Sequence, residues 1–117
     1  MTPAKLDLTI YQGATFKRIL RLKDSNDVAI DLTGAEARMQ VRGHVGDETP
    51  ILELNDTNGR LVMTDPVNGE ITLLVSNEDT AALDFSSGVY DLELAYSDFT
   101  VDRVLYGTVR LSKEVTR

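Results

Sequence analysis

The segment GVYDLELAYSDFTVDRVLYGTVRLSKEVTR, residues 88–117, closes the chain and decides its fold class. Apolar and polar side chains alternate on both sides of a short polar stretch, which predicts two β-strands joined by a tight turn. We expect one face of the first strand to lie in the core. That face carries Tyr90, Leu92, Leu94 and Tyr96.

The same period-two alternation runs through most of the chain. About eight strands, separated by turn signals at roughly 8–12-residue spacing, predict an all-β sandwich or barrel. Several strands carry apolar residues on both faces, which favours two packed sheets, and Val28–Leu32 is expected to be one short strand. In the strand around Arg18, that residue is in phase with Leu20 while Ile19 is not, and this pattern indicates a bulge at Arg18–Ile19.

The segment SNEDTAAL, residues 76–83, breaks the alternation. Ser76 is a suitable N-cap, and Asp79 three positions later approximates a capping box. The pattern predicts one short helix near residues 77–83, which crosses between the two sheets.

Composition limits the possible functions. The 117 residues are expected to form one domain, and their net charge of −7 argues against nucleic acid as a partner. No cysteine is present, which excludes disulfides and thiolate metal sites, and the apolar runs are far shorter than the roughly 20 residues of a membrane span.

No catalytic, metal-binding or cofactor-binding constellation stands out. The single histidine, His44, is followed by Asp47 and Glu48 in a polar loop, and a metal site would need a further ligand from elsewhere. The segment DTNG, residues 56–59, lacks the full spacing of a calcium loop. We therefore expect a non-enzymatic protein without metal or cofactor.

Four arginines form a candidate binding feature. Arg18 and Arg21 lie on the second predicted strand, and Arg38 and Arg42 on the third. If these strands are neighbours, the arginines form a basic stripe that suits docking of an acidic patch on another subunit. The alternative is a solvated strand face with cross-strand ion pairs.

Five segments stand out as motifs: Gln12–Phe16, Asp31–Gly34, Arg38–Arg42, Tyr90–Leu94 and Val115–Arg117. Together they resemble a group of small proteins encoded among the structural genes of tailed bacteriophages and prophages. More distantly, the order of elements resembles the N-terminal domain of phage baseplate upper proteins, which is an immunoglobulin-like antiparallel β-sandwich. The resemblance thus implies this fold, with about 7–9 strands.

The resemblance also implies a function. The expected protein is a structural component of the virion, made in the host bacterial cytoplasm, that binds other virion proteins or its own copies in a symmetric array. The expected position is the tail, the baseplate or the tail-fibre attachment, and the alternatives are capsid decoration and the neck. A carbohydrate-binding β-sandwich module is the alternative from another class, followed by an accessory of a glycosidase or protease.

The chain departs from the resembling family at the last hairpin. Relatives tend to read D-G-T there, whereas this chain reads Asp98–Phe99–Thr100. Either the loop is longer and Phe99 needs no positive φ, or backbone strain is tolerated because the aromatic ring has a role. Phe99, with Asp98 beside it, is a candidate anchor in a pocket of a neighbouring subunit. The alternative is that the ring folds back over the end of the sandwich.

Overall fold

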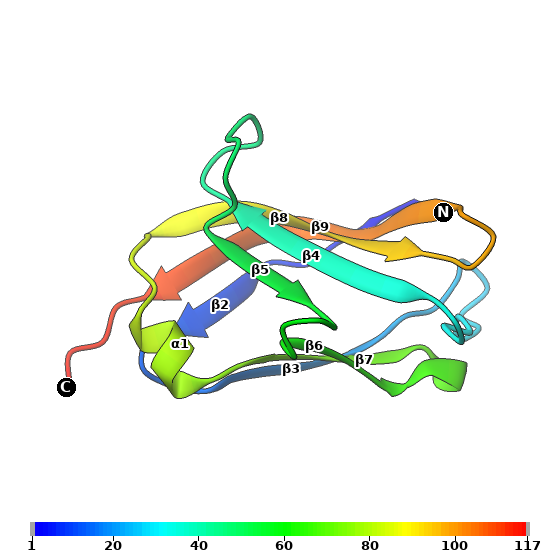
Figure 1. Ribbon diagram of the computed structural model, residues 1–117, viewed down its shortest axis with the longest axis horizontal. Coiled ribbons are helices and arrows are strands. Elements are labelled where there is room, and N and C mark those ends of the chain that lie inside the picture. Colours follow the sequence, from blue (N-terminus) through cyan, green and yellow to red (C-terminus); the bar gives the residue numbers. More distant parts are fainter. Residues whose placement is uncertain (1, 117) are drawn as a thin grey trace.

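Two β-sheets pack face to face in the computed structural model, which describes residues 2–116 (Figure 1). Arg117, the last residue of the tail motif, lies outside the described residues. The larger sheet has the order β1-β9-β8-β4-β5, with β2 also paired to β9, and the smaller sheet has the order β3-β7-β6. The strands are β1 (Ala4–Lys5), β2 (Leu8–Tyr11), β3 (Phe16–Arg21), β4 (Glu36–Arg42), β5 (Leu52–Asn55), β6 (Leu61–Asp65), β7 (Glu70–Val75), β8 (Ser87–Ala95) and β9 (Val101–Ser112).

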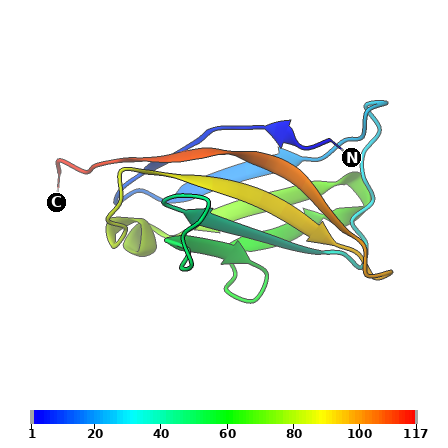
Figure 2. The same cartoon turned by 90° about the horizontal axis from the view of Figure 1, so that it is seen from above.

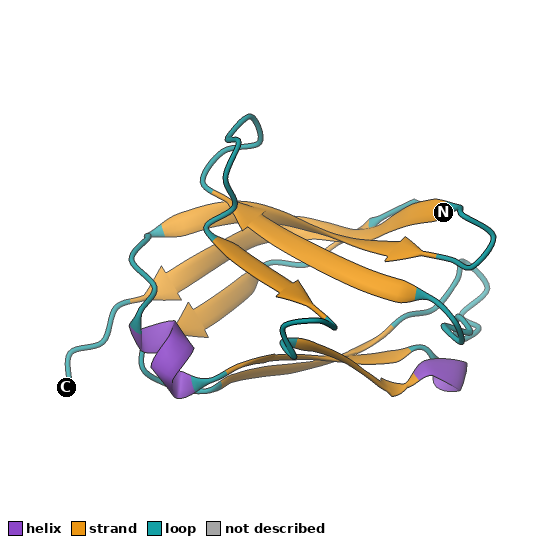
Figure 3. Ribbon diagram, in the orientation of Figure 1, coloured by secondary structure: helices purple, strands orange, loops and turns teal. Residues whose placement is uncertain are grey.

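The strands of the two sheets run in similar directions, as Figure 2 shows from above. Two short helices, η1 (Pro66–Asn68) and α1 (Asn77–Ala81), lie at opposite ends of the smaller sheet (Figure 3). No helix in the described part of the chain is long and apolar enough to cross a membrane.

The core lies between the sheets and follows the predicted alternation. Tyr90, Leu92 and Leu94 of β8 are buried, and Tyr96 packs against the core while partly exposed. On β4 the buried set is Ala37, Met39 and Val41. Burial of one face of the longer strands removes a large apolar area from water, which is the main term that stabilises the sandwich.

Two details of the sequence-based prediction are wrong. β3 pairs with β7 in an uninterrupted register from Phe16 to Arg21, so there is no bulge at Arg18–Ile19. Residues 28–32 form no strand and make only the isolated bridge Lys23–Ala29. The Asp24 carboxylate accepts from the backbone N–H groups of Asn26 and Val28, and these bonds fold the segment into a turn instead.

The N-terminal strands pair parallel to β9, whereas the other strand pairs are antiparallel. The chain bends between β1 and β2, where the Leu6 carbonyl approaches Gly107 so closely that a Cβ there would clash. The Tyr90 hydroxyl donates to this carbonyl at 2.5 Å, and the Thr108 N–H donates to the Asp7 carboxylate at 3.0 Å. The Thr108 bond lowers the pKa of Asp7.

The chain crosses from the larger to the smaller sheet between β2 and β3. The Thr80 side chain, which is fully buried in α1, forms hydrogen bonds with two consecutive residues of the turn that makes this crossing. Its hydroxyl accepts from the Gly13 N–H at 3.0 Å and donates to the Ala14 carbonyl at 2.8 Å. Gly13 has φ = 84°, a left-handed conformation that favours glycine, and the Glu114 carboxylate lies over it.

The predicted helix is confirmed as α1. The Ser76 hydroxyl accepts from the Asp79 N–H at 3.1 Å, which makes Ser76 the N-cap. The Asp79 carboxylate does not complete a capping box, because it accepts from Arg60 at 3.0 Å instead.

We predict that Thr80→Val lowers the free energy of unfolding by about 1–3 kcal/mol, because the Gly13 N–H and the Ala14 carbonyl lose their partner in a partly buried place. Chemical denaturation measures this. Thr9→Val, on an exposed position of β2, is the matched control and should stay within about 0.5 kcal/mol of the natural protein. Equal effects of the two substitutions would contradict a structural role for the Thr80 hydroxyl.

Burial raises the pKa of Tyr90 to about 12. A pKa that is higher in the folded than in the unfolded chain contributes stability below about pH 10, and this contribution is lost as the pH rises toward 12. The rise in pKa corresponds to at most about 2–3 kcal/mol, and screening by nearby solvent reduces the expected loss to about 1–2 kcal/mol. Tyr90→Phe should be less stable at neutral pH and should show a smaller loss between pH 10 and 12, as measured by denaturation at each pH. A loss as large as in the natural protein would mean that another group causes it.

Candidate interaction surfaces

The hairpin between β8 and β9 ends in a three-residue loop, Ser97–Phe99. The Phe99 N–H donates to the Tyr96 carbonyl at 3.0 Å, and the Tyr96 N–H donates to the Thr100 carbonyl at 2.9 Å. This is the pattern of a turn followed by a left-handed residue, a place that glycine usually takes. Phe99 occupies it with φ = 72°.

The Phe99 side chain is 95% exposed. The loop is longer than a two-residue turn, yet Phe99 still has a positive φ. The explanation that a longer loop frees Phe99 from a positive φ is therefore wrong. The alternative that the ring folds back over the sandwich is also wrong. A left-handed conformation costs a residue with a Cβ about 1–2 kcal/mol, and the exposed ring makes no packing that would offset this cost.

The surroundings of Phe99 are acidic. Asp98 Oδ1 accepts from the Thr100 hydroxyl at 2.6 Å and from the Thr100 N–H at 3.0 Å, and these bonds lower the pKa of Asp98. Burial raises the pKa of Tyr96, and the charges of Asp102 and Asp98 raise it further. Phe99, Asp98 and Asp102 together form what we call the hairpin tip.

The four arginines do not form one stripe. Arg18 and Arg21 lie on β3 in the smaller sheet, and Arg38 and Arg42 lie on β4 in the larger sheet. β3 and β4 follow one another in sequence but are not neighbours, because the chain changes sheets between them. The predicted basic stripe is therefore wrong as a single surface.

The individual arginines have different partners. Arg21 pairs across the strands with Glu70 at 3.4 Å, and Arg38 with Glu93 at 3.0 Å. Arg42 donates to the Asp47 carbonyl and to Gln40, both at 2.7 Å. Arg18 is exposed on β3, at the edge of the smaller sheet. The ion pairs of Arg21 and Arg38 match the solvated-face alternative.

A groove of about 380 Å³ lies on the outer face of the larger sheet. One wall is the loop between β4 and β5, which stands up from that face (Figure 1) and carries Val45 at 84% exposure. Its lining combines apolar and basic side chains, and we call it the basic groove. The residues that define it are Lys5, Arg42, Val45, Val89, Arg103 and Tyr106.

Only Arg42 of these residues was singled out by the sequence. The others come from segments far apart in the chain and meet because β1, β4, β8 and β9 are adjacent in one sheet. A sequence pattern that places β1 parallel to the last strand would have been needed to find the groove.

A larger hollow of about 690 Å³ opens between β1 and the end of β3. Two of its basic side chains already have acidic neighbours, since Arg21 pairs with Glu70 and Lys23 with Asp27. This hollow offers a partner less free charge than the basic groove.

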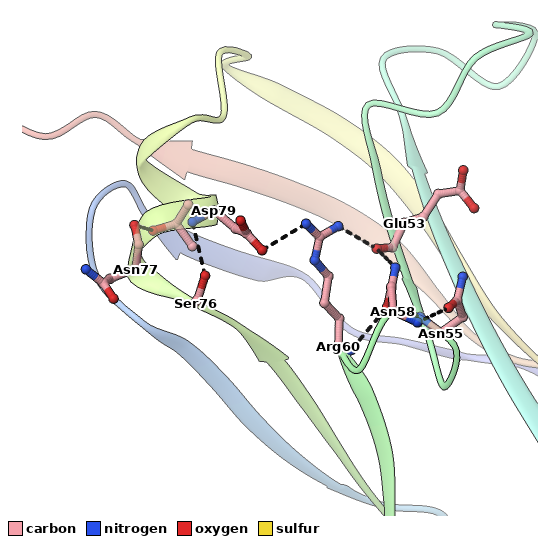
Figure 4. Close-up of polar contacts among 8 residues, drawn as sticks. Glu53, Asn55, Asn58, Arg60, Ser76, Asn77 and Asp79 are labelled. Atoms are coloured by element: carbon pink, nitrogen blue, oxygen red, sulfur yellow. Dashed lines mark hydrogen bonds and ion pairs between the residues drawn. The ribbon is translucent and has the colours of Figure 1, made fainter.

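Arg60 lies at the centre of a polar cluster beside the turn after β5 (Figure 4). It donates to the Glu53 carbonyl at 3.1 Å and to the Asp79 carboxylate at 3.0 Å, and so ties the turn after β5 to α1. In the same turn Asn55 and Asn58 each accept from the other's backbone N–H. The cluster therefore holds the two sheets together at this end.

Residues 2–116 contain no group of three histidine, cysteine, aspartate or glutamate side chains placed to hold a metal ion. His44 lies 3.6 Å from Asp47 in the exposed loop after β4.

The chain matches no protein-family model and no curated protein. Its fold is similar to the immunoglobulin-like domain of mouse leukocyte-associated immunoglobulin-like receptor 1, solved as a strand-swapped dimer. The TM-score is 0.50 at 16% sequence identity, over 92% of this chain and 88% of that chain. A structure of Tim-1 aligns over 99% of both chains with a TM-score of 0.49 and 9% identity.

At this identity the similarity to the mouse receptor domain shows the fold alone. The chain is an immunoglobulin-like β-sandwich with one short crossing helix, as predicted.

We predict that Phe99→Gly raises the free energy of unfolding by about 0.5–1 kcal/mol. Relief of the left-handed strain outweighs the greater backbone entropy that glycine gives the unfolded chain. Ser97→Gly, in the same loop but without a positive φ, is the control and should lower stability by about 0.5–1 kcal/mol in the same denaturation experiment. A fall for Phe99→Gly as large as for the control would show that the ring supports the fold.

Proposed function

We propose that this protein is a non-enzymatic structural component of a tailed-phage virion. It binds neighbouring copies or larger virion proteins at the tail, the baseplate or the tail-fibre attachment. The observation that carries the binding role is Phe99, which is 95% exposed and held at φ = 72° on the tip of a hairpin. A large apolar side chain in that position has no role in the fold, and aromatic anchors of this kind are typical of protein interfaces.

The virion setting is supported by the resemblance of sequence motifs. The motif Gln12–Phe16 forms the crossing between the sheets, and Tyr90–Leu94 forms the centre of β8. These motif residues have roles in the fold and carry no information on a position in the particle. That position must be determined by experiment.

The carbohydrate-binding alternative gains little from the exposed aromatic side chains. Tyr106 lies on β9, and Tyr11 lies on β2 opposite Ser112 of β9. Ser112 is six residues further along β9 than Tyr106, so the two rings are roughly 20 Å apart along the strand. Phe99 lies at the end of the hairpin. These rings do not form one flat platform on a sheet face in the part of the chain that the structure describes.

Location in the particle is the first test. We expect antibody-gold on intact virions to label the tail end. Gold spread over the head would favour capsid decoration, and gold at the junction of head and tail would favour a neck protein. No labelling, with an antibody shown to bind the native protein, would overturn the virion role.

The anchor role has its own test. Phage that carry Phe99→Gly should incorporate about tenfold less of this protein per particle, as quantified by immunoblot of purified virions, if the ring contributes about 1.4 kcal/mol to docking. Val115→Gly, at an equally exposed apolar residue of the C-terminal tail, is the control and should incorporate normally. Normal incorporation of Phe99→Gly would remove Phe99 from the interface.

A further inference from the structure

We propose that the hairpin tip of one copy docks into the basic groove of a second copy, so that the chains associate head to tail. This inference rests on the proposed function, because it names the partner that the tip binds. It joins two surfaces of one molecule, each with an apolar part, that carry opposite charge.

The hairpin tip is an apolar projection with negative charge on both sides. Phe99 projects into solvent, and Asp98 and Asp102 stand before and after it in the chain. The Thr100 bonds that lower the pKa of Asp98 also hold its carboxylate in place. The tip therefore presents one ring and the fixed negative charge of Asp98, and Asp102, at the start of β9, adds a second negative charge.

The basic groove has the opposite character. Val45, Val89 and Tyr106 give it an apolar lining, and its volume of about 380 Å³ lies in the range of pockets that bind small groups. Lys5, Arg42 and Arg103 contribute three positive charges, and Asp91, 3.8 Å from Arg103, contributes one negative charge. The net charge of the lining is thus +2, on a chain whose net charge is −7.

The Phe99 ring cannot enter the groove of its own molecule. Arg103 is the lining residue nearest the turn; it pairs with Glu93, and Tyr96 starts the turn three residues further along β8, which is about 10 Å. Beyond the turn the hairpin continues in the direction of its strands (Figure 2), which carries Phe99 further from the lining residues of the groove. Only a second copy can supply the tip, and a contact between two different surfaces builds rings or open filaments.

Sedimentation velocity of the purified full chain at increasing concentration, up to about 1 mM, tests the contact. The natural protein should form oligomers that grow with concentration and weaken as salt rises from about 0.05 to 0.5 M. Phe99→Gly should be monomeric because the tip is lost. Val45→Asp should be monomeric because a carboxylate enters the groove, while Val115→Asp, equally exposed but outside both surfaces, should behave as the natural protein does.

A mixture of Phe99→Gly and Val45→Asp gives the decisive result. Each variant keeps one intact surface, so the mixture should form a dimer of one copy each and nothing larger. A natural protein that stays monomeric throughout the range would overturn the proposal. Oligomers that survive in Val45→Asp, or a mixture that stays monomeric, would overturn the pairing of tip with groove.

The outcomes separate this inference from the proposed function. A chain that is monomeric alone but labelled in virions would keep its virion role and bind another protein through the tip. A chain that oligomerises through tip and groove but is absent from virions would keep the contact and lose the virion role.

Discussion

The hydroxyl of Thr80 fixes the point where the chain leaves one sheet for the other, and much of the structure depends on it. The hydroxyl bonds Gly13 and Ala14, while the Gln12 side chain donates to the Leu83 carbonyl and accepts from the Glu114 N–H. Three segments far apart in the chain therefore meet at one turn. β2 of the larger sheet ends at this turn and β3 of the smaller sheet begins there, so the turn fixes the position of one strand in each sheet. The Gln12–Gly13 pair thus has a structural reason.

Two positions with positive φ show opposite solutions to the same backbone problem. At Gly13 the chain uses glycine, and the Glu114 carboxylate covers the place of a side chain. At Phe99 the chain keeps a large ring in the same region of φ and exposes it to water. Natural proteins break local rules mainly at functional sites. The contrast is the reason to look for a partner at the hairpin.

The sequence predicted the elements whose signal is local. Alternation located β4, β8 and β9 and their buried faces, and Ser76 located the start of α1. It did not predict features that depend on long-range pairing. Arg21 and Arg38 are separated onto different sheets because strand order is not chain order, and the basic groove depends on β1 lying beside β9. Phe99 was singled out by the missing glycine, but its φ and its exposure come only from the structure.

The parallel pairing of β2 with β9 joins the two ends of the described chain. Asp7 and Thr108, which bond at this seam, are 101 positions apart. On the ribosome, β2 is made before β9 and lacks this partner until β9 has emerged, so the larger sheet is completed only then. Closing so long a loop is slow, because its entropy is lost before the contacts form. The seam is therefore expected to be the last part of the sandwich to form.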